Sequence, residues 1–146
     1  MAVISLDDQT ARVEVTVYRD AFERNLDKLV TDSIVIIEGE CSVDEFSGDH
    51  AVQASEIMTI DEARNRLARA LVLSMSESDL NNGFVHELET VIAGHANGRC
   101  PIAIEYARAD SRARLKLGEQ WLVNVSEGLL DGLKRHFGAQ HVHLEY

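Results

Sequence analysis

Short stretches in which apolar and polar residues alternate, each bounded by turn-forming residues, most strongly limit the folds open to this chain. The first such stretch covers residues 1–17 around the turn-forming sequence Asp-Asp-Gln-Thr. After that turn, Val13, Val15 and Val17 alternate with polar residues, which places the three valines on one face of a strand. The pattern predicts a β-hairpin whose two adjacent aspartates serve the turn.

Three further elements are expected before residue 61. Apolar residues at helical spacing predict a short amphipathic helix over 20–30. The nearly continuous apolar run 33–43 predicts a strand buried on both faces, in which Gly39 marks a bend or bulge. Another strand is expected over 50–60, after a turn-rich sequence. The predicted order is therefore strand, strand, helix, strand, strand.

The segment 61–70 is predicted to be a helical connector between two domains. Residues 1–70 hold 15 acidic and 7 basic residues, whereas residues 71–146 hold 10 acidic and 7 basic ones, so the second part is less acidic. Its apolar pattern predicts strands at 70–75, 101–108, 112–118, 121–126 and 141–146, and helices at 79–95 and 126–138. We therefore expect a mixed α+β chain whose second domain, 71–146, is a small two-layer α+β domain.

Both helices of the second part carry an apolar stripe. The stripe of the first consists of Leu80, Phe84, Leu88, Val91 and Ile92. Ser126 is placed to cap the second helix. The residues of that helix expected to face the core are Leu129, Leu130, Leu133 and Phe137.

Composition excludes several classes of protein. The net charge of −11 disfavours a general phosphate-coating role, because like charges repel. Cys41 and Cys100 form no C-x-x-C pair, so neither a disulfide framework nor a thiolate zinc site is indicated. No apolar run approaches the roughly 20 residues that span a bilayer, and no signal peptide is recognisable. We expect a cytoplasmic protein without a membrane contact.

Residue types that could support catalysis are present without a catalytic pattern. A metal site at His136, His141 and His143 is conceivable, but ordinary surface histidines explain them better, so no metal and no cofactor is predicted. Acid–base chemistry at Asp7 and Asp8 is disfavoured, because adjacent strand-end residues point in opposite directions. No nucleophile elbow, phosphate-binding loop or zinc-binding helix motif occurs, so no catalytic residue is predicted.

Two clusters of cations and aromatic rings offer binding chemistry. The first, which suits a nucleic-acid single strand, consists of Arg12, Tyr18, Arg19, Lys28, Phe46 and His50. The second, which suits nucleic acid or an acidic protein partner, consists of Arg108, Arg112, Arg114 and Lys116 beside Trp121. The alternative for both clusters is a solvated face next to core aromatic residues, and the acidic charge of the first part favours this alternative there.

Three segments closely resemble the C-terminal region of the bacterial replicative DNA polymerase III alpha subunit. They are SLDDQTARVEVTVYRDAFE, IVIIEGECSVDEFSGDHAVQASEIMTIDEAR and YARADSRARLKLGEQWLVNVSEGLLDGLK. The first segment alone also fits other OB-folds, such as the anticodon-binding domains of some aminoacyl-tRNA synthetases. The order of the three segments and the second domain favour the polymerase family.

This resemblance implies an OB-fold in residues 1–60 and, in residues 71–146, the domain that binds the tau subunit of the clamp loader. Only four strands are expected before the connector, where an OB-fold has five. The first strand is therefore expected to be missing, and the chain to be a fragment of a DNA-directed DNA polymerase. The family's catalytic residues have no counterpart in this sequence, so the fragment is expected to be non-catalytic.

The resemblance also implies partners for particular residues. The candidates for weak contact with single-stranded DNA are Arg12, Tyr18, Arg19, Phe46 and His50. The candidates for tau binding are Trp121, Leu144 and Tyr146. Other subunits of the polymerase III holoenzyme are further expected partners. The main alternative is a free-standing OB-type protein that binds tRNA or single-stranded DNA, which would need a complete barrel and a basic groove.

Overall fold

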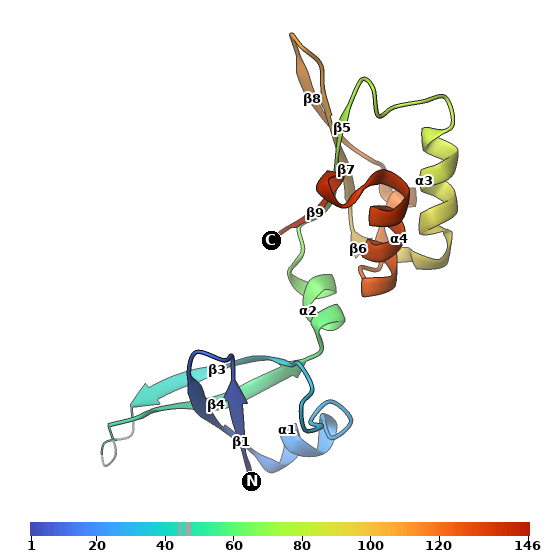
Figure 1. Ribbon diagram of the computed structural model, residues 1–146. Coiled ribbons are helices and arrows are strands. Elements are labelled where there is room, and N and C mark those ends of the chain that lie inside the picture. Colours follow the sequence, from blue (N-terminus) through green and yellow to red (C-terminus); the bar gives the residue numbers. More distant parts are fainter. Residues whose placement is uncertain (44, 46–47) are drawn as a thin grey trace. The chain divides into compact units, whose positions relative to one another are not determined.

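The computed structural model describes residues 1–43, 45 and 48–146. The chain divides into two compact units, Met1–Ile60 and Asp61–Tyr146, each with its own sheet (Figure 1). The predicted mixed α+β class is confirmed. The predicted DNA contact Phe46 lies outside the described residues.

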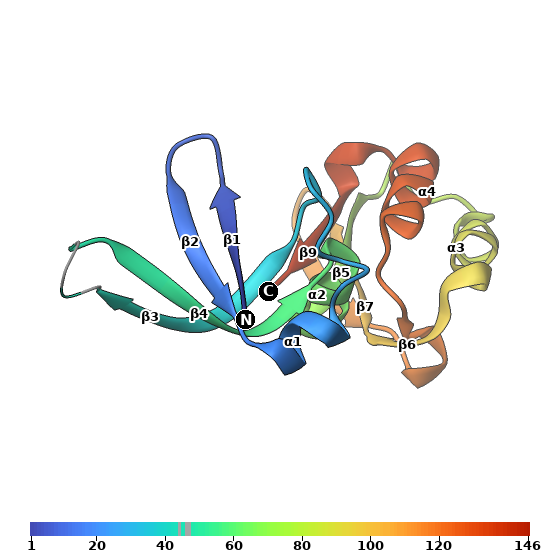
Figure 2. The same ribbon diagram turned by 90° about the horizontal axis from the view of Figure 1, so that it is seen from below.

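The first unit is a four-stranded sheet with one helix. Its elements are β1 (Ala2–Asp7), β2 (Arg12–Val17), α1 (Arg19–Arg24), β3 (Ile36–Val43) and β4 (His50–Met58). The strand order is β1-β2-β4-β3, with β2 and β4 parallel and the other two pairs antiparallel (Figure 2). Among the described residues no strand joins β1 to β3, so the sheet is open. The topology is consistent with an OB-fold-like domain that has four of the usual five strands.

The predicted hairpin forms because its turn satisfies its own backbone. Asp7 accepts a hydrogen bond from the amide of Gln9 at 2.7 Å, and Asp8 accepts from the amides of Thr10 and Ala11 at 2.9 Å each. Gln9 lies in the left-handed region with φ 69°. This arrangement confirms that the two aspartates serve the turn.

The edge position of β3 changes two expectations. The strand begins at Ile36 and is half-buried to exposed along its length, so the prediction of burial on both faces was wrong. Among the described residues β3 pairs with β4 alone, so it lies at the edge of the sheet, where fewer side chains cover its faces. The bulge expected at Gly39 is confirmed by a register shift between Glu38 and Gly39. A Cβ atom at Gly39 would lie 2.2 Å from the carbonyl oxygen of Gln53, which explains the glycine.

The helix predicted over 20–30 is shorter than expected. Helix α1 ends at Arg24, and Asn25 donates its side-chain amide to the carbonyl oxygen of Ala21 at 2.8 Å. Turns follow to Lys28, whose ammonium group donates to the carbonyl oxygen of Ile57 at 3.2 Å. The small core of this unit contains Val15, Val17, Ala21, Ala54 and Ile57.

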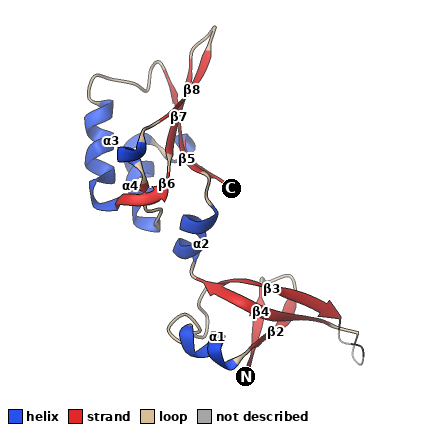
Figure 3. Cartoon of the chain, turned by 180° about the vertical axis from the view of Figure 1, so that it is seen from behind, coloured by secondary structure: helices blue, strands red, loops and turns tan. Residues whose placement is uncertain are grey.

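The second unit packs two of its helices on one side of a mixed sheet. Its elements are α2 (Ile60–Leu67, which begins at the unit boundary), β5 (Ala70–Ser76), α3 (Phe84–Ile92), β6 (Ala96–Cys100), β7 (Ile102–Ala107), β8 (Arg112–Lys116), α4 (Glu127–Phe137) and β9 (Val142–Glu145). The strand order is β8-β7-β5-β9, with β5 and β7 parallel. Helices α3 and α4 lie on the same side of this sheet (Figure 3).

The core of the second unit joins the sheet to both helices. Strand β5 contributes Leu71, Leu73 and Met75, and β7 contributes Ile102. The helix residues buried against them are Phe84, Leu88, Ile92, Leu129, Leu130 and Leu133, with Val91 and Phe137 partly buried at the margin. Leu80, which precedes α3, is partly buried against the same core. These are the two apolar stripes predicted from the sequence. The predicted cap is confirmed too, since Ser126 Oγ accepts a hydrogen bond from the amide of Leu129 at 3.2 Å.

The segment 121–126 differs from its prediction as a strand. It begins with a short 3-10 turn, Glu119–Trp121, and only Val123 makes isolated bridges, to Ala96 and Cys100. Strand β6, which supplies those partners, was not predicted. The helix predicted over 79–95 begins later than expected, at Phe84.

Gly98 permits the close approach of β6 to Val123, which gives a stability prediction. A Cβ atom at Gly98 would lie 1.9 Å from the backbone carbon of Val123 and 2.1 Å from the amide nitrogen of Asn124. Gly98→Ala should therefore destabilise the protein by about 2 to 3 kcal/mol, since backbone must shift to make room. Urea denaturation measures this.

Gly94→Ala is the matched control, because a Cβ atom there meets nothing within 4 Å. That variant should keep or slightly raise stability through the unfolded state. Equal denaturation midpoints for the two variants would contradict the explanation.

Candidate functional site

The predicted DNA contacts of the first unit lie at two ends of β2. Arg12 begins β2, and His50 begins the neighbouring parallel strand β4, so these two residues share one end of the sheet. Tyr18 and Arg19 follow the other end of β2. Six residues of strand span about 20 Å, so the two pairs are well separated. The structure therefore does not gather the four described candidates into one cluster.

Both candidate arginines already have acidic partners. Arg12 Nε lies 2.7 Å from Asp7 Oδ2, and Arg19 Nε lies 2.8 Å from Glu23 Oε1. Their side chains remain largely exposed, at 77% and 82%. Tyr18 is half exposed, at 51%. A phosphate at either arginine would thus compete with a carboxylate in a solvated, weakly bound pair.

A surface hollow adjoins Arg12. It has a volume of about 590 Å³ and is lined by the hairpin end and by the segment before β3, including Leu6, Val13, Asp32 and Ile34. Ile34 is 73% exposed. The hollow combines apolar walls with one arginine and several carboxylates, a combination that periodicity alone did not predict.

The tau candidates of the second unit differ in exposure. Trp121 ends the 3-10 turn and packs partly buried against the core, and Leu144 does the same from β9. Leu144 pairs in register with Leu71 of β5, so it completes the sheet. Tyr146 is 61% exposed. Of the three side chains, Tyr146 alone is mainly solvent-facing.

The basic hairpin predicted in the second part is formed by β7 and β8. Arg108 pairs with Glu77, with Nη2 lying 3.2 Å from Oε1. Arg114 Nη1 donates to Glu105 at 2.9 Å and to Glu145 at 2.7 Å. The Arg114 hydrogen bond is the main reason that the pKa of Glu145 is lowered, and the same bond raises the pKa of Arg114. This ion pair links β8 to β9, the two edge strands of the sheet.

The three C-terminal histidines lie in different surroundings. His141 Nδ1 lies 2.6 Å from the carbonyl oxygen of Ser74, and His141 Nε2 lies 3.9 Å from Asp79 Oδ1. His136 faces the carbonyl oxygen of Gly132, and His143 lies on β9. Within the described residues no group of three His, Cys, Asp or Glu side chains could hold a metal ion.

His141 and Asp79 line a hollow that was not predicted. It has a volume of about 810 Å³ at the ends of β5 and β7, where Ser76, Tyr106 and Arg112 also contribute. Hydrogen bonds from Ser76, chiefly from its hydroxyl, lower the pKa of Asp79. Asp79 follows β5 by three residues, and His141 is 62 residues further along the chain, so no local pattern could pair them.

The cysteines are not part of a shared site. Cys41 is exposed on β3, whereas Cys100 is buried at the end of β6, and both are free. Burial raises the pKa of the Cys100 thiol. Among the described residues, no helix has both the length and the apolar character needed to cross a membrane.

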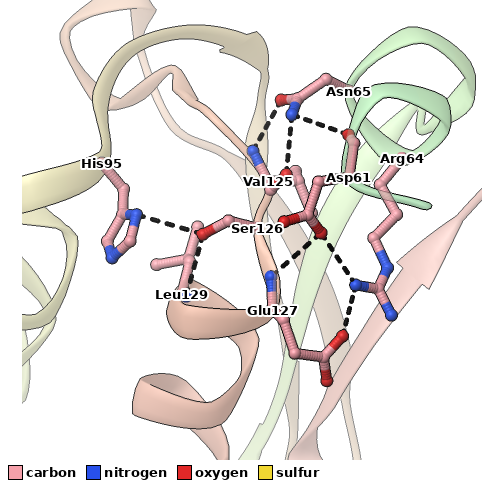
Figure 4. A network of polar contacts seen from close by, with 8 residues as sticks. All are labelled: Asp61, Arg64, Asn65, His95, Val125, Ser126, Glu127 and Leu129. Atoms are coloured by element: carbon pink, nitrogen blue, oxygen red, sulfur yellow. Dashed lines mark hydrogen bonds and ion pairs between the residues drawn. The ribbon is translucent and has the colours of Figure 1, made fainter. Parts of the chain in front are cut away.

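A polar network fixes helix α2 to the start of α4 (Figure 4). Asn65 exchanges two hydrogen bonds of 2.7 Å with the backbone of Val125, and Arg64 pairs with Asp61 and Glu127. Asp61 also accepts a hydrogen bond from the amide of Glu127 at 3.2 Å. The segment 61–70, expected to be a connector, is thus hydrogen-bonded within the second unit.

Two family models match this chain, each on one unit. The OB-fold nucleic acid binding domain matches residues 1–60, and the C-terminal domain of DNA polymerase III subunit alpha matches residues 87–138. Proteins named DNA polymerase III subunit alpha align with all 146 residues at 36% identity in Escherichia coli K12, 34% in Pasteurella multocida and 35% in Pseudomonas aeruginosa. The chain spans about an eighth of the length of these relatives, 12 to 13%.

Asn65 gives a test of the network. Asn65→Ala removes both hydrogen bonds to Val125 and leaves the amide and carbonyl groups of this buried residue unpaired, so we expect a loss of about 2 kcal/mol in the free energy of unfolding. Urea denaturation measures it. Asn124→Ala is the control, because its exposed side chain makes only a long bond of 3.4 Å to Ala96. A control as damaging as Asn65→Ala would reject the role of the network.

Asp8 gives a test of the hairpin turn. Its pKa is lowered to about 2, first by the hydroxyl of Thr10 and then by the backbone amides of Ala11 and Thr10. Because the folded pKa lies below the ordinary value, the stabilisation is present above about pH 4 and is lost as the pH falls through about 2. Carboxyl-carbon NMR should show Asp8 titrating near pH 2, and Thr10→Val should raise that pKa. An unchanged pKa in Thr10→Val would contradict this cause.

Proposed function

The whole chain is homologous to the C-terminal region of bacterial DNA polymerase III alpha subunits, and we propose that it acts as a non-catalytic module of that replicative polymerase. One observation carries the proposal. The two family models match the two units in order, and the relatives cover both units. A free-standing OB-type binder would account for the first unit only.

The proposed task of the first unit is to contact single-stranded template DNA. Support comes from the match to an OB-fold nucleic acid binding domain over residues 1–60. The exposed ring of Tyr18 and the adjacent Arg19 offer one stacking surface and one cation at the same end of β2. The net charge of −11 keeps this contact weak, and the contact between Arg19 and phosphate makes it sensitive to salt.

The proposed task of the second unit is to tether the polymerase to the clamp-loader tau subunit in the cytoplasm. Support comes from the match of residues 87–138 to the C-terminal domain of the alpha subunit. Tyr146, an exposed aromatic residue next to the edge strand β9, is the anchor that protein partners commonly use. Trp121 and Leu144, the other two candidates, pack partly buried against the core of this unit.

One calorimetric experiment tests both tasks. The chain is titrated with purified tau C-terminal domain and, separately, with a single-stranded oligonucleotide at two salt concentrations. Tyr146→Ala should weaken tau binding about tenfold or more and leave DNA binding unchanged. Tyr18→Ala, the matched exposed tyrosine of the first unit, should have the opposite pattern. Absence of tau binding by the unmodified chain would reject the tethering role.

The ion pair between Arg19 and Glu23 gives a second test of DNA binding by the first unit. Arg19→Ala should weaken DNA binding and reduce its salt dependence by about one counterion. Glu23→Gln should strengthen binding, because it releases Arg19 from its carboxylate partner. A DNA affinity that is the same in both variants as in the unmodified chain, or that does not depend on salt, would reject this contact.

A further inference from the structure

Strand β8 is an edge of the second sheet and carries cations at alternate positions. Among the described residues it is paired only with β7, in the order β8-β7-β5-β9. Arg112, Arg114 and Lys116 lie opposite Ala107, Glu105 and Ala103, and therefore share one face of the sheet. Ala113 and Leu115 lie on the other face, and Leu115 is 52% exposed. The edge therefore has a basic face and an apolar face.

The free backbone groups of β8 belong to these same basic residues. Leu117 donates its amide to Ile102, and Arg108 donates to Ser111, which fixes the bonded positions of the antiparallel pair. The alternation directs the amides and carbonyls of Ala113 and Leu115 toward β7. The backbone groups of Arg112, Arg114 and Lys116 consequently point away from β7, toward the open edge.

The charges along this edge are only partly neutralised. Arg114 is held by Glu105 and Glu145. Arg112 and Lys116 make no ion pair or side-chain hydrogen bond with any residue that the structure describes. Two cations four residues apart, with an exposed leucine between them, are thus available to a partner.

We propose that the open edge of β8 binds an extended acidic peptide as an additional strand. The free amides and carbonyls of Arg112, Arg114 and Lys116 bond the peptide backbone. Acidic side chains stand opposite Arg112 and Lys116, and an apolar side chain stands opposite Leu115. In antiparallel orientation, five successive peptide residues lie opposite Lys116 to Arg112. The first and fifth are acidic, the second is apolar, and the third and fourth can be of any type. The acidic residues of the peptide and the cations of β8 lie on the same face, because side chains alternate between the two faces every two residues in both strands.

The charges of the edge disfavour two other occupants. A second copy of β8 would place like charges opposite one another, Arg114 against Arg114 in a two-fold antiparallel pair, which is destabilising. Single-stranded nucleic acid is held by cations that follow its backbone together with aromatic rings on which its bases stack. Neither β8 nor the residues of β7 on its basic face, Ala103, Glu105 and Ala107, is aromatic. An acidic peptide can pair with the open backbone groups of β8 and place carboxylates opposite its cations.

This inference goes beyond the proposed function, because it concerns an edge that none of the tau or DNA candidates occupies. Its experiment uses neither tau nor polymerase activity. Loss of tau binding would therefore leave this inference intact. Likewise, failure of the acidic peptide to bind would leave the proposed tau and DNA tasks untouched.

The test is an NMR titration of the nitrogen-15-labelled 146-residue chain with the acetylated and amidated peptide TELTVET. The amides of Arg112, Arg114 and Lys116 should shift, and their exchange with water should slow. Arg112→Glu should weaken binding about fivefold, since one attraction becomes a repulsion. Arg99→Glu, an equal charge change at an exposed residue of β6, should alter the affinity by less than twofold.

Two altered peptides separate strand addition from simple charge attraction. The lysine version, TKLTVKT, should not bind detectably. A version of TELTVET methylated on the backbone nitrogens of both glutamates and the central threonine should also fail, because it cannot donate to the edge. Full affinity of the methylated peptide, or equal losses in Arg112→Glu and Arg99→Glu, would overturn the proposal.

Two further outcomes would assign the edge to another occupant and overturn the proposal. One is slowed exchange of these amides that depends on protein concentration without peptide, which would indicate self-pairing. The other is a single-stranded oligonucleotide that shifts the same amides at lower concentration than the peptide does.

Discussion

The pairing of β5 with two strands from distant parts of the chain is the constraint on which the second unit depends. β5 lies between β7, which is parallel to it, and β9, which is antiparallel and contains the last strand residues of the sequence. Its backbone groups are therefore bonded on both sides, and Leu71 and Leu73 can be fully buried without an unpaired polar group. The two helices then have a continuous apolar surface to cover.

Polar side chains join elements of the second unit that the apolar core alone does not hold together. Asn65 reproduces a backbone pairing with Val125 and so holds α2 at the start of α4. Arg114 crosses from one edge strand to the other by binding Glu145. Each acts by supplying hydrogen bonds between elements whose backbones do not pair directly. The Arg114 ion pair is exposed enough that solvent and salt weaken its contribution, whereas the neutral hydrogen bonds of Asn65 are partly buried.

Local charge, more than net charge, decides where this acidic chain can bind a partner. Arg12 and Arg19 in the first unit are neutralised by neighbouring carboxylates, which limits contact with phosphate groups. In the second unit Arg112 and Lys116 lie on an edge strand whose own acidic neighbours are bound by Arg114. A net charge of −11 therefore coexists with a short basic edge, because charges farther away than about 10 Å are largely screened at ordinary salt.

The sequence by itself determined the features that depend on neighbours along the chain. These include the Asp7–Asp8 turn, the cap at Ser126 and the apolar stripes of α3 and α4, because each arises from residues a few positions apart. The glycine at position 39 inside an apolar strand pattern also indicated a bulge, although the partner strand that makes room for it lies elsewhere in the chain. Only the tertiary structure decided that 121–126 bridges β6 instead of forming a strand, that β3 is an exposed edge, and that Arg114 meets Glu145. Periodicity shows which faces of an element are apolar. It carries no information on which distant backbone will lie beside that element, and those pairings placed the candidate surfaces.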